Sequence, residues 1–157
     1  MEFRINKEAE HDSLQLREAS KNDSVESEIL KGKRFLCAED NELNAEILQA
    51  LLETEGASCE ICPNGVEIVN RFTDVVPGEF DMILMDVQMP LMNGYEATKA
   101  IRQSRNPLGK SIPIVAMTAN AFADDIQQSM DAGMNAHISK PMDLPRLKKV
   151  VAELVEK

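Results

Sequence analysis

The sequence lacks any apolar stretch long enough to cross a bilayer, which takes about 20 consecutive apolar residues. Its first residues, MEFRINKEAEHDS, also lack the basic and then apolar layout of a secretory signal peptide. Without a membrane span or an export signal, the chain is expected to lie in the cytoplasm.

The chain has only three cysteines, Cys37, Cys59 and Cys62, and an odd number without an export signal does not indicate a disulfide framework. The CxxC spacing of Cys59 and Cys62 is typical of metal or redox sites. It lies in a predicted strand, however, where residues three apart point to opposite faces. Two buried structural thiols are therefore favoured. The two histidines, His11 and His137, are far apart and accompany no cluster of metal ligands.

Basic charge is also scarce, since 27 acidic residues face 17 lysines and arginines and the net charge is −10. Such an excess argues against a nucleic-acid backbone or an anionic membrane surface as the main partner. It suits a protein that handles metal cations or docks on a basic surface. With 157 residues, the chain is long enough for one domain with a real core and a modest extension.

Residues 1–31 differ from the rest, being polar, mixed in charge and free of proline and glycine. We predict an extension or linker here, either disordered or a loosely docked helix. An alternative is that MEFRI is the trailing strand of an upstream domain. Residues 32–157 are predicted to form the single folded domain.

From Lys33 onward, apolar strand-like runs alternate with one-sided helical patterns. Strands are predicted at 34–38, 58–62, 82–85, 112–117 and 135–139, and helices at 41–55, 66–72, 95–105, 121–132 and 144–155. In the first helix the expected inner residues are Leu43, Ile47, Leu48, Leu51 and Leu52, and in the fourth Phe122, Ile126 and Met130. Strict alternation indicates parallel strands joined by right-handed crossovers. The predicted fold is therefore a doubly wound, flavodoxin-like α/β sandwich of three layers, with strand order 2-1-3-4-5.

Polar residues follow four of these strands. The fully apolar run MILM ends at Asp86, which taken alone would be read as a turn or capping residue. Glu39 and Asp40 follow the first strand, Thr118 the fourth and Lys140 the fifth. Since the carboxyl ends of parallel strands meet at one edge of the sheet, these side chains are expected to converge there.

Three clustered carboxylates repel one another, and a hard divalent cation relieves that repulsion. The expected ion is Mg²⁺, with Mn²⁺ as the alternative. Lys140 can pair with Asp86 and Thr118 can donate a hydrogen bond, so the set predicts phosphoryl transfer to one carboxylate nucleophile. The acidic loop AEDN disfavours a flavin or dinucleotide phosphate, and the sequence contains no GxxxxGK[ST] or GxSxG motif.

The motifs LCAEDNELN, MILMDVQMPLMNGYEAT, IPIVAMTANAF and AHISKP resemble the receiver domain of two-component response regulators, from about Lys33 to the C-terminus. The resemblance implies that Asp86 is phosphorylated. It makes Asp40 a direct Mg²⁺ ligand, Glu39 a ligand acting mainly through water, and the backbone carbonyl of Gln88 a further ligand. Thr118 and Lys140 would hold the phosphoryl group, and the peptide bond from Lys140 to Pro141 would be cis.

His137 occupies the position of the family's switch residue, which is often Tyr or Phe and moves inward when Thr118 is drawn to the phosphate. A satisfied structural histidine is an equal alternative. Gln88 and Asn120 are expected to flank the path of the hydrolytic water and to tune the lifetime of the acyl phosphate. Repacking around the last strand would form the output surface.

The resemblance implies a histidine kinase or histidine phosphotransfer domain as partner, with a phosphorylation-dependent dimer as a further option. A receiver of this kind catalyses only its own phosphorylation and dephosphorylation, and is not an enzyme for external substrates. An extension before the domain, with no output domain after Lys157, resembles the C-terminal receiver of a hybrid sensor kinase, whose parent chain could be membrane-anchored. The alternatives are a stand-alone regulator, a metal-dependent aspartyl-phosphate phosphatase, and a degenerate docking module, which is disfavoured because every site residue is present.

Overall fold

The computed structural model describes residues 28–119 and 123–155. Its strands are β1 (Arg34–Ala38), β2 (Ser58–Cys62), β3 (Met82–Asp86), β4 (Ile114–Thr118) and β5 (Ala136–Ser139). They form one parallel sheet in the order β2-β1-β3-β4-β5, which confirms the predicted doubly wound α/β fold. The fourth strand begins two residues later than predicted, directly after Pro113, which has no N–H to donate to a neighbouring strand.

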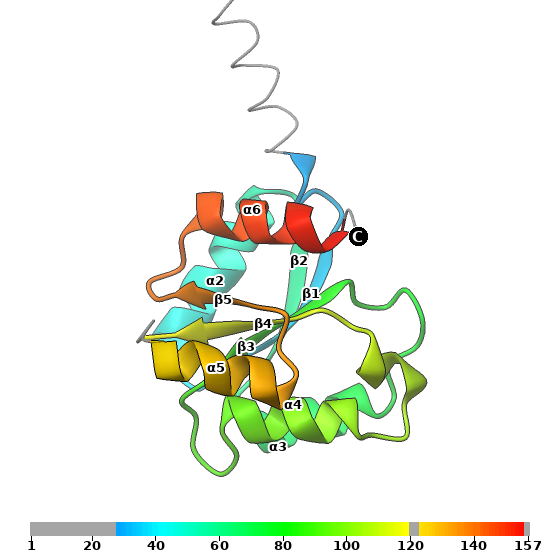
Figure 1. Ribbon diagram of the computed structural model, residues 1–157. Helices are drawn as coiled ribbons and strands as arrows, with labels where there is room; N and C mark the ends of the chain where they lie inside the picture. The colour runs from blue at the N-terminus through cyan, green and yellow to red at the C-terminus, as the bar shows by residue number, and fades with distance from the viewer. Residues whose placement is uncertain (1–27, 120–122, 156–157) are drawn as a thin grey trace, which may run out of the picture.

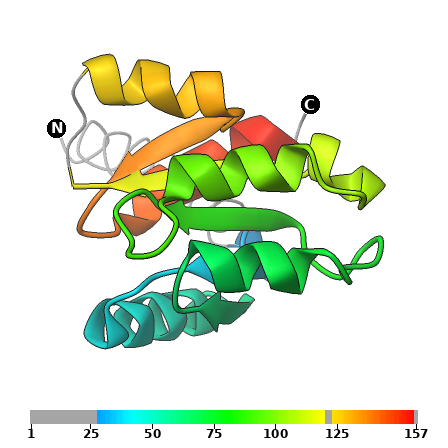
Figure 2. The same ribbon diagram turned by 90° about the horizontal axis from the view of Figure 1, so that it is seen from below.

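Helices cover both faces of the sheet. They are α2 (Glu42–Thr54), α3 (Gly65–Phe72), α4 (Gly94–Arg102), the short 3-10 helix η1 (Pro107–Lys110), α5 (Ala123–Ala132) and α6 (Leu144–Val155). Figure 1 shows α2 and α6 on one face and α3, α4 and α5 on the other, and Figure 2 shows the same layers from below. Asparagines cap α2, α3 and α4, each accepting a hydrogen bond from the backbone N–H three residues on.

The core lies on both faces of the sheet, since every residue of the central strand β3 and of its neighbour β4 is buried. One cluster packs α3 and α4 on the sheet around Phe72 and Ile101, and the other packs α2 and α6 around Phe35, Leu52 and Val151. Cys62 belongs to the first cluster and Cys59 packs against the second, so these two free cysteines point to opposite faces as predicted.

The extension predicted over residues 1–31 reaches this core at its end. Leu30 is wholly buried in the cluster under α2 and α6, while residues 1–27 lie outside the described part of the chain. The last few residues before β1 therefore pack with the folded domain.

For three residues the predicted burial is wrong. Leu43 and Ile47 of α2 are 64% and 48% exposed, and only Leu48 and Leu52 of that helix are buried. Successive residues of a helix are about 100° apart, so Ile47 lies well to one side of Leu48 and misses the sheet. Met130 of α5 is 63% exposed.

In α5 the inner position next to Met130 is taken by Ser129, which is 4% exposed and donates its hydroxyl to the carbonyl of Asp125. Of the other two predicted inner residues there, Ile126 is half-buried and Phe122 lies outside the described residues.

Candidate functional site

The register of the sheet brings the four strand ends to one edge. Ala38 pairs with Met85, so Glu39 and Asp86 both follow directly after paired residues. Asp86 pairs with Met117, which places Thr118 one residue beyond it on the neighbouring strand. The carboxyl edge of the sheet therefore gathers the predicted residues as parallel pairing requires.

Three carboxylates form the centre of the site. Glu39, Asp40 and Asp86 each offer an oxygen, and these oxygens lie within 4.8 Å of one another. Asp86 is only 2% exposed and Glu39 is 5% exposed, while Asp40 faces solvent. The buried Oδ2 of Asp86 has no hydrogen-bond partner among the described residues. A cluster of oxygen donors with one buried oxygen left unpaired fits a hard divalent cation such as Mg²⁺.

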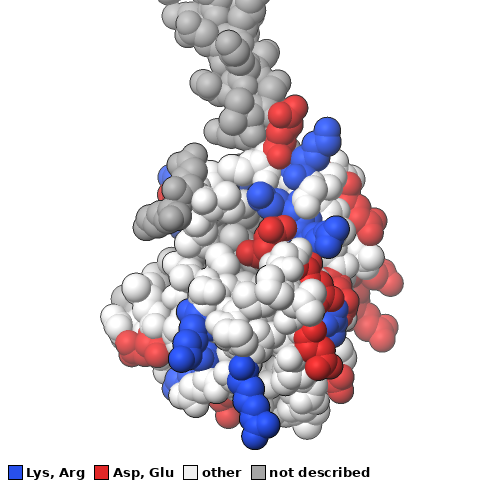
Figure 3. All heavy atoms as spheres, turned by 90° about the vertical axis from the view of Figure 1, so that its right-hand side faces the viewer, with Lys and Arg blue, Asp and Glu red and all other residues white. Residues whose placement is uncertain are grey.

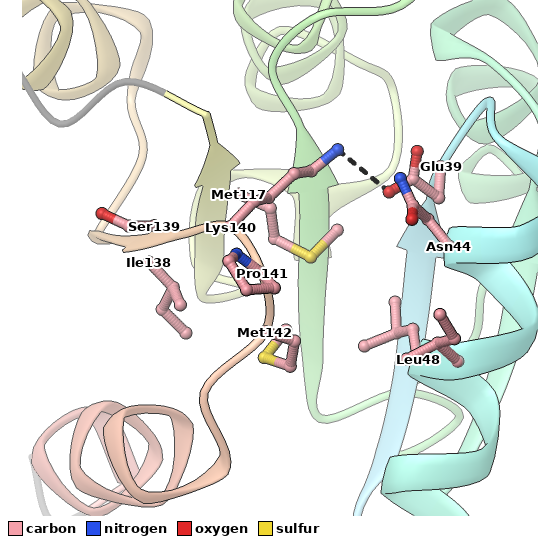
Figure 4. Close-up of a pocket in the computed structure, with 10 residues that line it drawn as sticks. Glu39, Asn44, Leu48, Met117, Ile138, Ser139, Lys140, Pro141 and Met142 are labelled. Atoms are coloured by element: carbon pink, nitrogen blue, oxygen red, sulfur yellow. Dashed lines mark hydrogen bonds and ion pairs between the residues drawn. The ribbon is translucent and has the colours of Figure 1, made fainter.

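Lys140 bridges the two buried carboxylates. Its Nζ lies 3.0 Å from Oε1 of Glu39 and 3.0 Å from Oδ1 of Asp86, and Figure 4 shows the side chain reaching across to Glu39. Burial lowers the pKa of Lys140, but its hydrogen bonds to Glu39 and Asp86 outweigh that effect and raise it above the usual range.

Asp86 is the carboxyl group that this site perturbs most clearly. Burial and the neighbouring Glu39 raise its pKa to about 7, although Lys140 acts in the opposite direction. Its Oδ1 also accepts a hydrogen bond of 3.3 Å from the backbone N–H of Gln88. The side chain of Asp86 therefore has one oxygen held by two donors and one buried oxygen without a donor among the described residues.

The loop after β3 turns back closely over the end of that strand. The backbone N–H of Gly94 donates to the carbonyl of Val87 at 2.9 Å. A Cβ atom at Gly94 would collide with the backbone oxygen of Asp86, so the close approach requires glycine at this position. This loop holds Gln88 at the surface beside the acidic cluster.

Two openings lead to the site. A polar cavity of about 420 Å³ is lined by Gln88, Tyr95, Thr118 and neighbouring residues of the β3–α4 loop and α5. A mainly apolar groove of about 320 Å³ runs between α2 and the loop after β5, and Glu39 and Lys140 form its polar end. One polar cavity and one mainly apolar groove therefore border the site.

The structure brings Glu39, Asp40, Asp86, Thr118 and Lys140 together at this edge. The backbone N–H of Lys140 donates to the carbonyl of Thr118 at 2.8 Å, and the peptide bond from Lys140 to Pro141 is cis, as the resemblance implies.

Two further predicted residues are not placed at the site. His137 is half-buried on β5, where it pairs with Ala116 and lines a separate cavity with Asp143 and Arg146. Its switching role stays a prediction. Asn120 lies outside the described residues.

Sequence reasoning missed the groove and the residues beside it. Asn44, Ile47 and Met142 line the groove, and Leu43 lies one helical turn from Ile47 on α2 with most of its side chain exposed. One feature of the sequence could have indicated that Leu43 is exposed. The apolar residues of this helix cover too wide an arc for one sheet to bury them all. Within residues 28–119 and 123–155, the structure has no helix long and apolar enough for a membrane span.

The family model of the response regulator receiver domain matches residues 35–152. Probable histidine kinase 2 of Oryza sativa subsp. indica is 36% identical over 137 residues, which cover 80% of this chain and only 13% of that kinase. The chain thus corresponds to a small part of this relative.

Two solved structures are similar as well. The receiver domain of the sensor histidine kinase PA1611 from Pseudomonas aeruginosa, with a magnesium ion in its active site cleft, matches with a TM-score of 0.71 at 32% identity over 80% of this chain and 99% of that one. A chain in the co-crystal structure of the Saccharomyces cerevisiae histidine phosphotransfer protein Ypd1 with the receiver domain of Ssk1 has a TM-score of 0.69 at 32% identity, covering 79% of this chain and 89% of that one.

Proposed function

The chain belongs to the response regulator receiver domain family of two-component signalling, and we propose that it accepts a phosphoryl group on Asp86. The observation that carries the proposal is the surroundings of Asp86. This buried carboxylate has two further carboxylates within 4.8 Å and a lysine ammonium at 3.0 Å, with one of its own oxygens unpaired among the described residues.

Glu39, Asp40, Asp86 and the backbone carbonyl of Gln88 would hold Mg²⁺ or Mn²⁺. The bound ion supplies charge neutralisation for the phosphoryl oxygens. The similar receiver of PA1611, which carries magnesium in its active site cleft, supports this assignment.

In the transfer step, a carboxylate oxygen of Asp86 forms a bond to phosphorus while the donor's bond to phosphorus breaks, and the donor keeps that electron pair. Lys140 moves from Asp86 to a phosphoryl oxygen, and the hydroxyl of Thr118 donates to another. Water later hydrolyses the acyl phosphate, at a rate set in part by Gln88 and Asn120. The chain performs only this reaction on itself and does not turn over external substrates.

The proposed partner is a histidine kinase or a histidine phosphotransfer domain. The likeness to the receiver crystallised with Ypd1 supports this choice, as do the apolar groove and the exposed Leu43 and Ile47 beside the site. A nucleic-acid partner is not proposed. The net charge is −10, and on the face shown in Figure 3 basic and acidic side chains are interspersed, without a continuous basic surface.

The similarity to parts of long histidine kinases favours a receiver of a hybrid kinase that works in the cytoplasm. After phosphorylation, movement of Thr118 would repack the surface around β5, with His137 as the proposed switch residue and a dimer as one form of output.

The test is phosphorylation by acetyl phosphate with Mg²⁺, followed by intact mass. The wild type should gain one phosphoryl group and Asp86→Asn none. Asp74→Asn, which changes an exposed carboxylate on another surface, is the matched control and should be labelled like the wild type. Labelling of Asp86→Asn at the wild-type rate would refute the assignment. Multiple turnover of an external phosphomonoester would instead identify a phosphatase.

A further inference from the structure

The apolar groove meets the acidic site at a polar end made by three side chains from different elements. Leu48, Met117 and other apolar residues line most of its length. Glu39, Lys140 and Asn44 line the end nearest Asp86, and Figure 4 shows the amide of Asn44 beside Glu39, near the gap that Lys140 spans. A group at this end of the groove would therefore lie close to Asn44 as well as to Glu39.

The local structure of α2 does not require an asparagine at this position. Asn41 already caps the helix, accepting a hydrogen bond of 3.0 Å from the backbone N–H of Asn44. Asn44 is the third residue of the helix, and its own side chain takes no part in this cap. The amide of Asn44 makes no hydrogen bond to any residue that the structure describes, and the residue is exposed. Its helix thus gains nothing from this side chain.

The other polar groups at this end are already engaged. Glu39 is 5% exposed, and its two oxygens accept hydrogen bonds from Lys140 and from the backbone N–H of Asn41. Lys140 is held by Glu39 and Asp86. Asn44 therefore offers a neutral acceptor oxygen and two donor hydrogens to whatever enters the groove.

A phosphohistidine donor has a group that such an acceptor can hold, the second nitrogen of its ring. When its nitrogen–phosphorus bond breaks, the electron pair returns to the imidazole as the bond from Asp86 to phosphorus forms. If the other ring nitrogen carries a proton, the leaving group is neutral imidazole, whereas without that proton it is an anion. An acceptor that holds this N–H orients the ring and favours the protonated form, whose leaving group is neutral imidazole.

We propose that Asn44 is a specificity-determining residue that binds the imidazole of a phosphohistidine donor, its amide oxygen accepting the N–H of the ring nitrogen that does not carry the phosphoryl group. The inference rests on the proposed function and adds to it the recognition of the leaving group. It predicts that Asn44 distinguishes donors by whether they contain imidazole.

The experiment compares two small phosphoryl donors with the same acceptor protein. Acetyl phosphate contains no imidazole, whereas phosphoimidazole contains imidazole but is not attached to a protein. In Asn44→Ala the rate with phosphoimidazole should fall by about five- to tenfold, as expected for one lost hydrogen bond, while the rate with acetyl phosphate stays within about twofold. Mg²⁺ affinity, measured by calorimetry, should not change. Asn70→Ala, an exposed asparagine of α3, is the matched control and should leave both rates unchanged.

Asn44→Asp retains an acceptor oxygen and should restore most of the ratio between the labelling rates with phosphoimidazole and with acetyl phosphate. Equal slowing with both donors, unchanged rates with both, or an Asn44→Asp ratio as low as that of Asn44→Ala would each overturn the proposal. Failure of the wild type to be labelled by either donor would instead refute the phosphoacceptor function itself, so the two failures are distinguishable.

Discussion

Asp86 is buried beside Glu39, and this placement decides how the metal-free site responds to pH. Burial and the neighbouring carboxylate raise the pKa of Asp86 to about 7. A raised carboxyl pKa means that the folded state binds a proton that the unfolded state releases, over the pH range between the two pKa values. In the metal-free protein, the charge of Asp86 is therefore destabilising above about pH 7, and the penalty is relieved as the pH falls below that value.

The same shift predicts a pH-dependent affinity for Mg²⁺. Only the ionised carboxylate is a good ligand, so the ion competes with a proton on Asp86. The association constant should fall up to tenfold per pH unit below about pH 7 and level off above it, as measured by calorimetry between pH 5.5 and 8.5 (a range of about three units around that pKa).

Asp86→Asn is the control, because it removes the titrating group and should give weaker binding with little pH dependence around neutrality. An equally steep dependence in Asp86→Asn would assign the proton to another group.

Residue types at strand ends could be read from the sequence because parallel strands bring their carboxyl ends together. Glu39, Asp40, Asp86, Thr118 and Lys140 were predicted in this way, and the structure places them at one edge. Asn44 could not be predicted, because an exposed asparagine in a helix has no periodic signal. Its significance comes from a groove that exists only once α2 and the loop after β5 are packed.

At the scale of elements, α2 has more apolar residues than the sheet can cover. Leu48 and Leu52 bury their side chains, while Leu43 and Ile47 remain exposed one turn apart on the flank next to the groove. The sequence predicted the helix correctly but overestimated its buried face, since periodicity cannot say how wide an arc the neighbouring layers will reach.

This exposed flank predicts a selective defect. Ile47→Glu should reduce phosphotransfer from a phosphorylated histidine phosphotransfer domain by at least about tenfold, because a charge in an apolar contact costs more than one lost methyl contact. Labelling by acetyl phosphate should be unchanged, since the acidic site itself is intact. The two rates are followed in parallel by gel-based phosphoprotein detection.

Met130→Glu supplies the matched control, because Met130 is also an exposed apolar residue of a helix, 63% exposed on α5. It should transfer at the wild-type rate. An equal loss in both variants, or a loss of acetyl phosphate labelling in Ile47→Glu, would contradict a docking role for this flank of α2.

At the scale of the whole molecule, the alternation of strands and helices predicts parallel strands, and 2-1-3-4-5 is a common order for five of them. The strand order could therefore be predicted without knowledge of any contact. The N-terminal limit of the domain could not be predicted. The predicted domain begins at residue 32 and the family model matches from residue 35, yet Leu30 lies in the core cluster under α2 and α6. Ile29 and Leu30 form a short apolar pair in a polar segment, which gives no periodic pattern, so the burial of Leu30 appears only in the packed structure.

The burial of Leu30 predicts that the residues before β1 stabilise the domain. Leu30 is 0% exposed, so Leu30→Ala should lower the free energy of unfolding by about 2–5 kcal/mol, the range for truncating a buried leucine. Denaturant unfolding of the metal-free protein measures the change. Val76→Ala, which truncates an apolar side chain that is 58% exposed, is the control and should cost less than about 0.5 kcal/mol.

If Leu30→Ala unfolds at the same denaturant concentration as the wild type, the segment before β1 contributes nothing and the domain begins at its first strand. If the predicted loss is found, removing residues 1–32 should destabilise the protein by at least as much, and the folded unit includes the last residues of the segment that leads into it.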